Sequence, residues 1–152
     1  MLNEAQINAI IQKSLDYEAP STSLCTTLFF QNQKRIKADI CINHDSFVSG
    51  IRLVHAMFDH YYKNCSLKKI IDDGAYAKKG QVIISLEGPL ADLLEVKETI
   101  IYYLSRMTAI TDSTRKYCSR LERLNTSKTL IEGHFWTPGM ILLEKFASSL
   151  GG

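Results

Sequence analysis

Residues 72–89 read Asp-Asp-Gly-Ala-Tyr-Ala-Lys-Lys-Gly-Gln-Val-Ile-Ile-Ser-Leu-Glu-Gly-Pro, and this stretch decides the fold. Its first three residues are typical of a turn, and Lys79-Gly80 marks a second break, because glycine adopts backbone conformations that other residues avoid. The run from Gln81 to Leu86 is rich in β-branched residues and predicts a strand. Pro89 then suits the first turn of a helix. We therefore expect a turn, a strand and a helix in direct succession.

The sequence on both sides of this stretch predicts a mixture of strands and helices. Residues 35–42 alternate with the period of two that marks a half-buried strand. Further strands are predicted over residues 24–30, 47–51 and 65–71, and helices from Asn3 and from Ile51. Residues 90–124 are helical in pattern, with a break expected over residues 108–111 because β-branched residues gather there. The predicted fold class is α+β.

The end of the chain predicts a short appendage to this domain. Residues 129–131 predict a strand, and Thr137-Pro138-Gly139 opens a last helix. We therefore divide the chain into a domain of residues 1–125 and a truncated β/α unit of residues 126–152.

Composition indicates a globular protein without an obvious ligand. The chain has 152 residues, of which 45% are hydrophobic and 22% are charged, and a net charge of +2. No apolar run approaches the roughly 20 residues that cross a bilayer, and the first four residues do not resemble a secretion signal. The four cysteines lack metal-ligand spacing. We expect a cytoplasmic protein without membrane association, metal or cofactor.

Two local patterns could carry chemistry, and for both we favour a structural interpretation. His55 and Asp59 lie one helical turn apart and could share a metal ion, but no third ligand is apparent. Lys78 and Lys79 lie in a hairpin, as do the modified lysines of lipoyl and biotinyl carriers, but the flanking signature of those carriers is missing.

A basic stretch occupies the second half of the long helical region. It contains Arg106, Arg115, Lys116, Arg120, Arg123 and Lys128. The stretch could be a relic anion site or a nucleic-acid surface. We favour a solvated helix face, because acidic residues are interspersed and no aromatic interleaving supports base stacking. No nucleic-acid partner is expected.

Three segments together resemble the quinolinate phosphoribosyltransferase (nicotinate-nucleotide pyrophosphorylase) family. Residues 73–89 are similar to the family's Asp-Gly…Gly-Gln-Val…Glu-Gly hairpin. Residues 104–117 resemble its Leu-Gln-Arg-x-Ser-Gly-Ile-Ala-Thr helix junction. Residues 137–152 are similar to its Thr-Pro-Gly-Leu-Arg…Glu-Lys-Tyr-Ala-Val…Gly-Gly. The segments lie in register, and the likeness covers most of the chain from about residue 40.

The resemblance implies an open-faced α/β sandwich, an antiparallel sheet with long helices, followed by a strand-helix remnant of a barrel. It also implies a reaction in which quinolinate attacks the anomeric carbon of phosphoribosyl pyrophosphate with magnesium, and decarboxylation gives nicotinate mononucleotide. It further implies a homodimer in which each sandwich covers the barrel mouth of its partner.

Two motifs depart from the family pattern at charged positions. Where the family's Glu-Arg-Thr motif has Arg, this chain has Glu98. A carboxylate there would repel a dicarboxylate by about 4 kcal/mol, at roughly 4 Å and an effective dielectric near 20. Where the family's first barrel strand reads Asp-Thr-Arg-Lys-Thr, His134 and Phe135 replace the Arg and the Lys. Neither side chain binds a carboxylate or phosphate bidentately.

These departures lead to the hypothesis of a non-catalytic paralogue that acts as a dimerisation or adaptor module. Its predicted interface consists of Ile131, His134, Phe135 and Trp136, because an orphaned barrel strand leaves an exposed edge beside aromatic side chains. We expect a homodimer or another protein partner.

The alternative hypothesis is enzymatic. The chain would be a fragment or subunit of a nicotinate-nucleotide pyrophosphorylase whose barrel is supplied separately. Arg106, Arg115 and Lys116 would then remain as anion-binding groups, and Mg²⁺ would act with phosphoribosyl pyrophosphate.

Overall fold

The computed structural model describes residues 5–6, 9–10, 12–13, 34–124, 128, 130–133 and 135–152. The strand predicted over residues 24–30 lies outside these ranges. The described residues near the N-terminus are helical, as the pattern from Asn3 predicts. The hydroxyl of Tyr61 donates to Oε1 of Gln12 at 2.7 Å, so this helical segment lies beside the end of the next helix.

A three-stranded antiparallel sheet forms one layer of the molecule. Its strands are β1 (Arg35–Cys41), β5 (Val82–Pro89) and β3 (Ser66–Lys69), with β5 in the centre. The strand predictions over residues 35–42, 65–71 and 81–86 are confirmed. Side chains alternate along each strand, so Ile36 and Ile40 of β1 share the face that packs on the core.

A smaller ladder joins β2 (Ser46–Phe47) to β4 (Tyr76–Ala77). The strand predicted over residues 47–51 is therefore confirmed only at its start. Gly74 and Gly80 bracket β4 with φ of 82° and 81°, a left-handed conformation that favours glycine. The backbone N–H of Gly80 donates to the carbonyl of Ile42 at 2.8 Å, which ties the hairpin to the end of β1.

Helix α3 (Ile51–Tyr61) begins at Gly50, which has no side chain to cap the helix. The carboxylate of Asp73 takes this role from the turn before β4. Its Oδ1 accepts from the N–H groups of Gly50 at 2.6 Å and Ile51 at 2.8 Å, and its Oδ2 accepts from Arg52 N–H at 3.0 Å. The turn thus satisfies three donors that a helix start leaves free.

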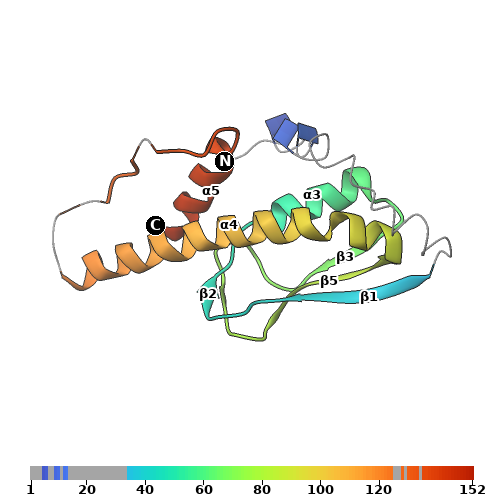
Figure 1. Cartoon of the computed structure of the whole chain (residues 1–152). Coiled ribbons are helices and arrows are strands. Elements are labelled where there is room, and N and C mark those ends of the chain that lie inside the picture. The colour runs from blue at the N-terminus through green and yellow to red at the C-terminus, as the bar shows by residue number, and fades with distance from the viewer. Residues whose placement is uncertain are drawn as a thin grey trace.

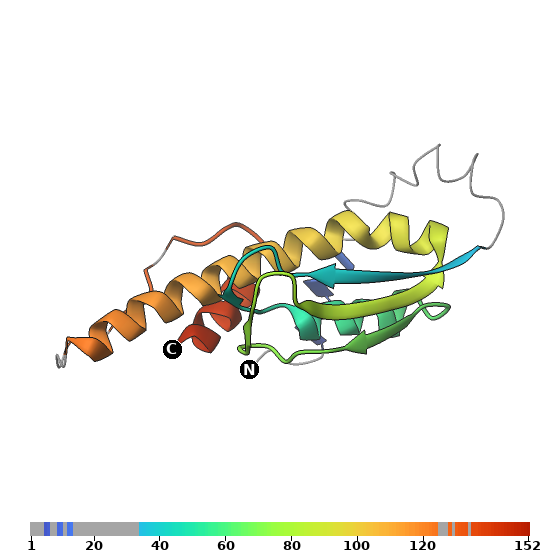
Figure 2. The same cartoon turned by 90° about the horizontal axis from the view of Figure 1, so that it is seen from below.

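Two further helices complete the fold: α4 (Leu90–Arg123), which is 34 residues long, and α5 (Ile141–Gly151). Figure 1 shows α3 and α4 on one face of the sheet and α5 beside the C-terminal half of α4. Seen from below in Figure 2, the other face of the sheet carries none of these helices. The largest fully buried side chains between the layers are Ile51, Met57, Ile84, Ile100, Met107 and Leu143. The predicted open-faced α+β sandwich is confirmed.

The break predicted over residues 108–111 is wrong, because α4 is continuous. Thr108 Oγ1 accepts from Ser49 N–H at 3.1 Å and donates to Ser49 O at 3.2 Å. Thr111 Oγ1 donates to Ala147 O at 2.7 Å. These tertiary contacts override the weak helix propensity of threonine.

The strand predicted over residues 129–131 is wrong for Leu130 and Ile131, which have no regular structure. A strand needs a neighbour, and neither residue pairs with a strand of the described part. The helix predicted after Gly139 is confirmed as α5. The division of the chain at residue 125 stays a prediction. None of the described helices combines the length and the apolarity needed to cross a bilayer.

Candidate functional site

The segment after α4 folds back onto this helix through one charged cluster. We call it the α4–α5 junction and define it by Arg106, Thr137 and Glu144. Arg106 donates from Nε and Nη2 to Glu144 Oε1, at 3.1 and 2.7 Å, and from Nη2 to Thr137 Oγ1 at 3.0 Å. The N–H of Thr137 donates to Glu144 Oε2 at 3.0 Å. Both oxygens of the Glu144 carboxylate are therefore engaged.

The junction holds Glu144 as a carboxylate although its side chain is only 5% exposed. Burial by itself raises the pKa of Glu144, but the hydrogen bonds from Thr137 and Arg106, with the charge of Arg106, outweigh burial. The net effect lowers the pKa of Glu144 below its ordinary value. A buried anion thus meets a guanidinium that is half exposed.

Close helix packing fixes α5 next to this cluster. A Cβ atom at Gly151 would lie 2.6 Å from Thr114 Cβ and 2.7 Å from Thr111 O, so only glycine allows this approach. Tyr102, on α4, donates its hydroxyl to the sulfur of Met140 at 3.5 Å. Contacts on both sides of the junction therefore set the position of α5.

A shallow hollow of about 370 Å³ opens beside the junction. Arg106 lines it together with Trp136 and Phe135, and Glu132 and Glu144 lie in the same wall. The ring of Trp136 lies 5.3 Å from Nζ of Lys145, a cation–π contact. Because Glu144 already neutralises Arg106, the hollow in this form does not suit a dianion.

The three predicted anion-binding residues do not converge on this hollow. Arg106 contacts α5, whereas the guanidinium of Arg115 lies 5.6 Å from the ring centre of Phe47 in β2. Lys116 forms an ion pair with Asp112 at 2.6 Å. Nine residues separate Arg106 from Arg115, which places them on opposite sides of a helix.

Three of the four predicted interface residues, Ile131, Phe135 and Trp136, lie in the segment before α5. Phe135 is 100% exposed and Ile131 is 84% exposed, whereas Trp136 is half-buried. His134 lies outside the described residues. Ile141 and Leu142 at the start of α5 are exposed as well. Such a run of exposed apolar side chains suits a surface that another structure covers.

Glu98, at the position where the family resemblance implies Arg, lies on the exposed surface of α4. Its Oε1 forms an ion pair with Nζ of the neighbouring Lys97 at 2.9 Å. The pair is exposed on both sides, so its net attraction is weak.

No group of three or more His, Cys, Asp or Glu side chains in the described residues could hold a metal ion. His55 Nδ1 and Asp59 Oδ2 lie 2.8 Å apart as an isolated pair. The Mg²⁺ of the alternative hypothesis stays a prediction. The backbone of Lys78 and Lys79 bonds to Gln81 and Asp45 in a plain hairpin.

Sequence reasoning missed Glu144 as the partner of Arg106. The signal was present, because Thr137 and Glu144 both fall in the third family-like segment, and Arg106 falls in the second. The order of these segments suggested a relationship but did not say that their side chains touch.

Comparison with known proteins extends this picture. Residues 21–108 match the family model described as quinolinate phosphoribosyl transferase, N-terminal domain. A probable nicotinate-nucleotide pyrophosphorylase of Methanothermobacter thermautotrophicus is 25% identical over 94% of this chain and 50% of its own length. A relative of the same description from Archaeoglobus fulgidus is 28% identical over 78% of this chain and 45% of its own length.

Solved structures show the same fold. The nicotinate-nucleotide pyrophosphorylase from Francisella tularensis superposes with a TM-score of 0.90 over 100% of this chain and 53% of its own, at 16% identity. NadC from Streptococcus pyogenes superposes with a TM-score of 0.87 over 99% and 54%, at 19% identity. This chain thus spans about half the length of the curated relatives that it matches.

Proposed function

This chain belongs to the quinolinate phosphoribosyltransferase family, and from that premise we propose that it is the sandwich half of a nicotinate-nucleotide pyrophosphorylase. The barrel half comes from a separate chain or from further residues of a longer one. The complete enzyme joins the nitrogen of quinolinate to the anomeric carbon of phosphoribosyl pyrophosphate. Pyrophosphate leaves from that carbon, and a ring carboxylate leaves as carbon dioxide, giving nicotinate mononucleotide for NAD biosynthesis.

The extent of the sequence match carries the proposal. The similarity to the Methanothermobacter relative runs over 143 residues, well past the end of the sandwich. The three residues of the α4–α5 junction lie in the two later family-like segments, so the motif residues build the contact that seats α5 on α4. A chain kept only as a sandwich module has no evident need of that contact.

The exposed side chains before and within α5 fit the same proposal. Phe135, Ile131 and Ile141 are apolar and uncovered in the described part. A barrel that continues from this segment would bury them, and burial of apolar surface contributes about 25 cal/mol per Å². We propose that this surface joins the barrel half, in an oligomer with the family's shared-site arrangement.

The adaptor hypothesis has less support. Its motivating observation, a carboxylate at Glu98 in place of a guanidinium, remains valid. However, the relatives named above are described as enzymes, and no adaptor stands among them. We therefore prefer an enzyme half in which one of the family's anion-binding residues has been replaced, at position 98.

A chimera tests the proposal. This chain replaces the matched half of the Methanothermobacter relative, and formation of nicotinate mononucleotide is measured with quinolinate, phosphoribosyl pyrophosphate and Mg²⁺. Because Glu98→Arg removes a repulsion, we expect it to raise the rate by about tenfold or more, the equivalent of about 1.4 kcal/mol. The matched control is Glu95→Arg, which makes the same charge change on the exposed surface of α4.

The chimera also separates the two hypotheses. Product formation that responds to position 98 and not to position 95 supports the enzyme half. Folded chimeras, verified by circular dichroism, that form no product with either residue at position 98 would contradict it.

A further inference from the structure

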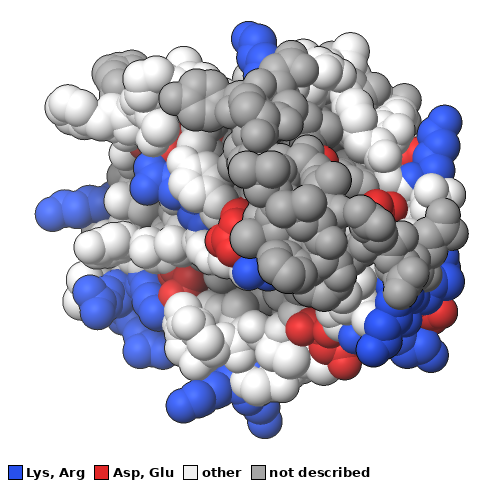
Figure 3. Space-filling view, turned by 45° about the vertical axis from the view of Figure 1, so that its right-hand side comes forward, with Lys and Arg blue, Asp and Glu red and all other residues white. Residues whose placement is uncertain are grey.

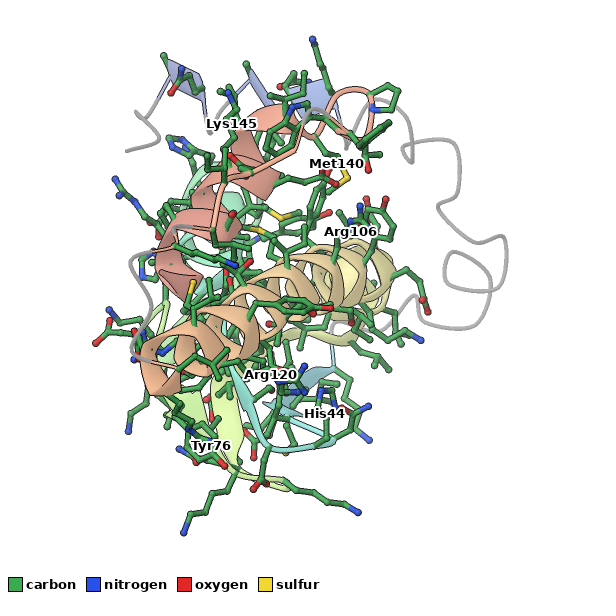
Figure 4. All side chains as sticks on the ribbon, turned by 90° about the vertical axis from the view of Figure 1, so that its left-hand side faces the viewer. His44, Tyr76, Arg106, Arg120, Met140 and Lys145 are labelled. Carbon is green, nitrogen blue, oxygen red and sulfur yellow. The ribbon has the colours of Figure 1, made fainter. Side chains whose placement is uncertain are left out.

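We propose that the surface at the C-terminal half of α4 binds single-stranded nucleic acid. We call this surface the basic tip; it combines the β4–β5 hairpin with the end of α4. Its cations are Lys78, Lys79, Arg115, Lys116, Arg120 and Arg123. In Figure 4, Tyr76, His44 and Arg120 lie below α4, whereas Met140 and Lys145 lie above it with α5. The basic tip thus lies on the other side of α4 from the α4–α5 junction. For this reason the proposal does not depend on the proposed function.

Positive charge is concentrated at the basic tip. Six of the 18 Lys and Arg residues lie there with three of the 16 Asp and Glu residues, namely Asp45, Asp112 and Glu122, so the remainder of the chain has twelve cations and thirteen anions. Figure 3, which brings the opposite end of the molecule forward, shows Lys and Arg side chains along its left, lower and right edges, with Asp and Glu side chains beside those on the right. An excess of one sign on one surface attracts a polyanion.

Two of the three carboxylates at the tip are engaged in building it. Asp45 accepts from the hydroxyl of Tyr76 at 2.9 Å and from the N–H of Lys79 at 2.8 Å. Asp112 accepts from the N–H of Phe47 at 3.3 Å and pairs with Lys116. Among the described residues, Lys116 is the one tip cation in a salt bridge. Of the other five, Arg115 and Arg120 lie over aromatic rings, and Lys78, Lys79 and Arg123 are exposed and form no salt bridge within the described residues.

Aromatic rings lie among these cations, which the sequence alone did not indicate. Phe47 and Tyr76, from β2 and β4, pack edge to face with ring centres 5.2 Å apart, and the guanidinium of Arg115 contacts the Phe47 ring. On α4, the guanidinium of Arg120 lies 5.9 Å from the ring centre of Tyr117. Tyr76 is 48% exposed and Tyr117 is 57% exposed, so both offer a ring surface to a ligand. Tyr117 lies two positions, about 200°, from Arg115 around α4, so these two rings lie on different sides of the helix and a strand must pass around its end to reach both.

The combination of cations and exposed aromatic rings favours one class of polyanion over the others. Single-stranded nucleic acid presents phosphates at regular intervals and unstacked bases, which stack on exposed tyrosine rings and on guanidinium planes. A duplex hides the faces of its bases and would use only the cations. A peptide of Asp and Glu residues has no flat rings that could stack on the tyrosines. The combination of free cations with exposed rings therefore favours the single strand.

The test is fluorescence anisotropy of the full chain with a labelled oligouridylate of roughly 16 nucleotides, within the range that compact single-strand binding folds cover. If four phosphates are contacted, the logarithm of affinity falls with the logarithm of salt concentration with a slope of about −3. Lys78→Ala/Lys79→Ala should make this slope less negative by about 1.4, because two phosphate contacts are lost. Tyr117→Ala should weaken binding roughly 5- to 100-fold with little change in slope.

The matched control is Lys63→Ala/Lys68→Ala, which removes the same charge from exposed positions outside the tip. Its affinity should equal that of the unchanged chain, and circular dichroism checks that every variant is folded. Equal weakening by both double variants, or equal affinity for the single strand and a duplex of the same length, would overturn the proposal. Tighter binding of polyglutamate than of the oligouridylate would overturn it in favour of an acidic protein partner.

Discussion

The buried carboxylate of Glu144 should contribute more to stability than any exposed ion pair of this chain. Glu144 accepts one hydrogen bond from a backbone N–H and two from Arg106. A hydrogen bond to a buried charge contributes about 1.5–3 kcal/mol. The pair with Arg106 adds about 1 kcal/mol, because its guanidinium is half exposed and screened by water. Glu144→Ala should therefore cost about 3 kcal/mol.

Urea unfolding measures this cost, and the chain has a built-in probe. Trp136 is the single tryptophan, and it contacts Lys145 of α5, so its fluorescence reports the docking of α5. A loss of about 3 kcal/mol corresponds to a drop in Tm of about 6–12 °C. The control is Lys97→Ala, which breaks an exposed pair and should change stability by less than about 0.5 kcal/mol.

The pH dependence gives an independent check of the same reasoning. The pKa of Glu144 is lower in the folded chain than its ordinary value of 4.5, so its contribution is fully present above that value and is lost as pH falls through the folded pKa. The stability difference between the unchanged chain and Glu144→Gln should be constant near neutral pH and shrink in acid. A Glu144→Ala variant as stable as the Lys97→Ala control, or a difference that grows in acid, would refute the argument.

Three other predictions concern single contacts. Asp73→Ala should destabilise the chain by about 1–2 kcal/mol in urea unfolding, because it removes the cap of α3; an unchanged midpoint would contradict that role. Gly151→Ala should cost about 1–3 kcal/mol, since its methyl group would collide with Thr114, and a neutral effect would mean that α5 shifts freely. The hydrogen bond to Asp45 is the largest cause that raises the pKa of Tyr76, so Asp45→Ala, which removes the acceptor, should move the alkaline absorbance titration of tyrosine to lower pH; an unmoved titration would show that this bond is absent in solution.

Elements could be predicted from the sequence where the spacing of their apolar residues matches the face that packs on the core. The strand over residues 35–42 was predicted because one of its faces packs on the core. The break over residues 108–111 was predicted wrongly, because propensity cannot account for the bond from Thr111 Oγ1 to Ala147, 36 positions away. The strand over residues 129–131 depended on neighbours that the described part does not contain.

In the candidate site, too, contacts between residues far apart in the sequence could not be predicted. Arg106 was predicted as an anion-binding residue, and that role stays a prediction; its partner Glu144 lies 38 positions away and could not be predicted from local spacing. The grouping of Arg106 with Arg115 could have been rejected from the sequence, since nine residues are two and a half helical turns. The rings of Phe47 and Tyr76 reach the end of α4 only through the pairing of β2 with β4.

The length of α4 has a consequence for the dynamics of the chain. At about 1.5 Å per residue, its 34 residues extend about 51 Å, and its first half packs on the sheet while its second half packs on α5. Helical turns without tertiary partners are marginal in water. Amide hydrogen exchange should therefore divide this one helix into two protection classes. Amides before Met107 open with the sheet, and amides beyond Arg115, past the contacts of Asp112 and Arg115 with β2, open whenever α5 departs. The number of protected amides in α4 would therefore report whether α5 is docked on it.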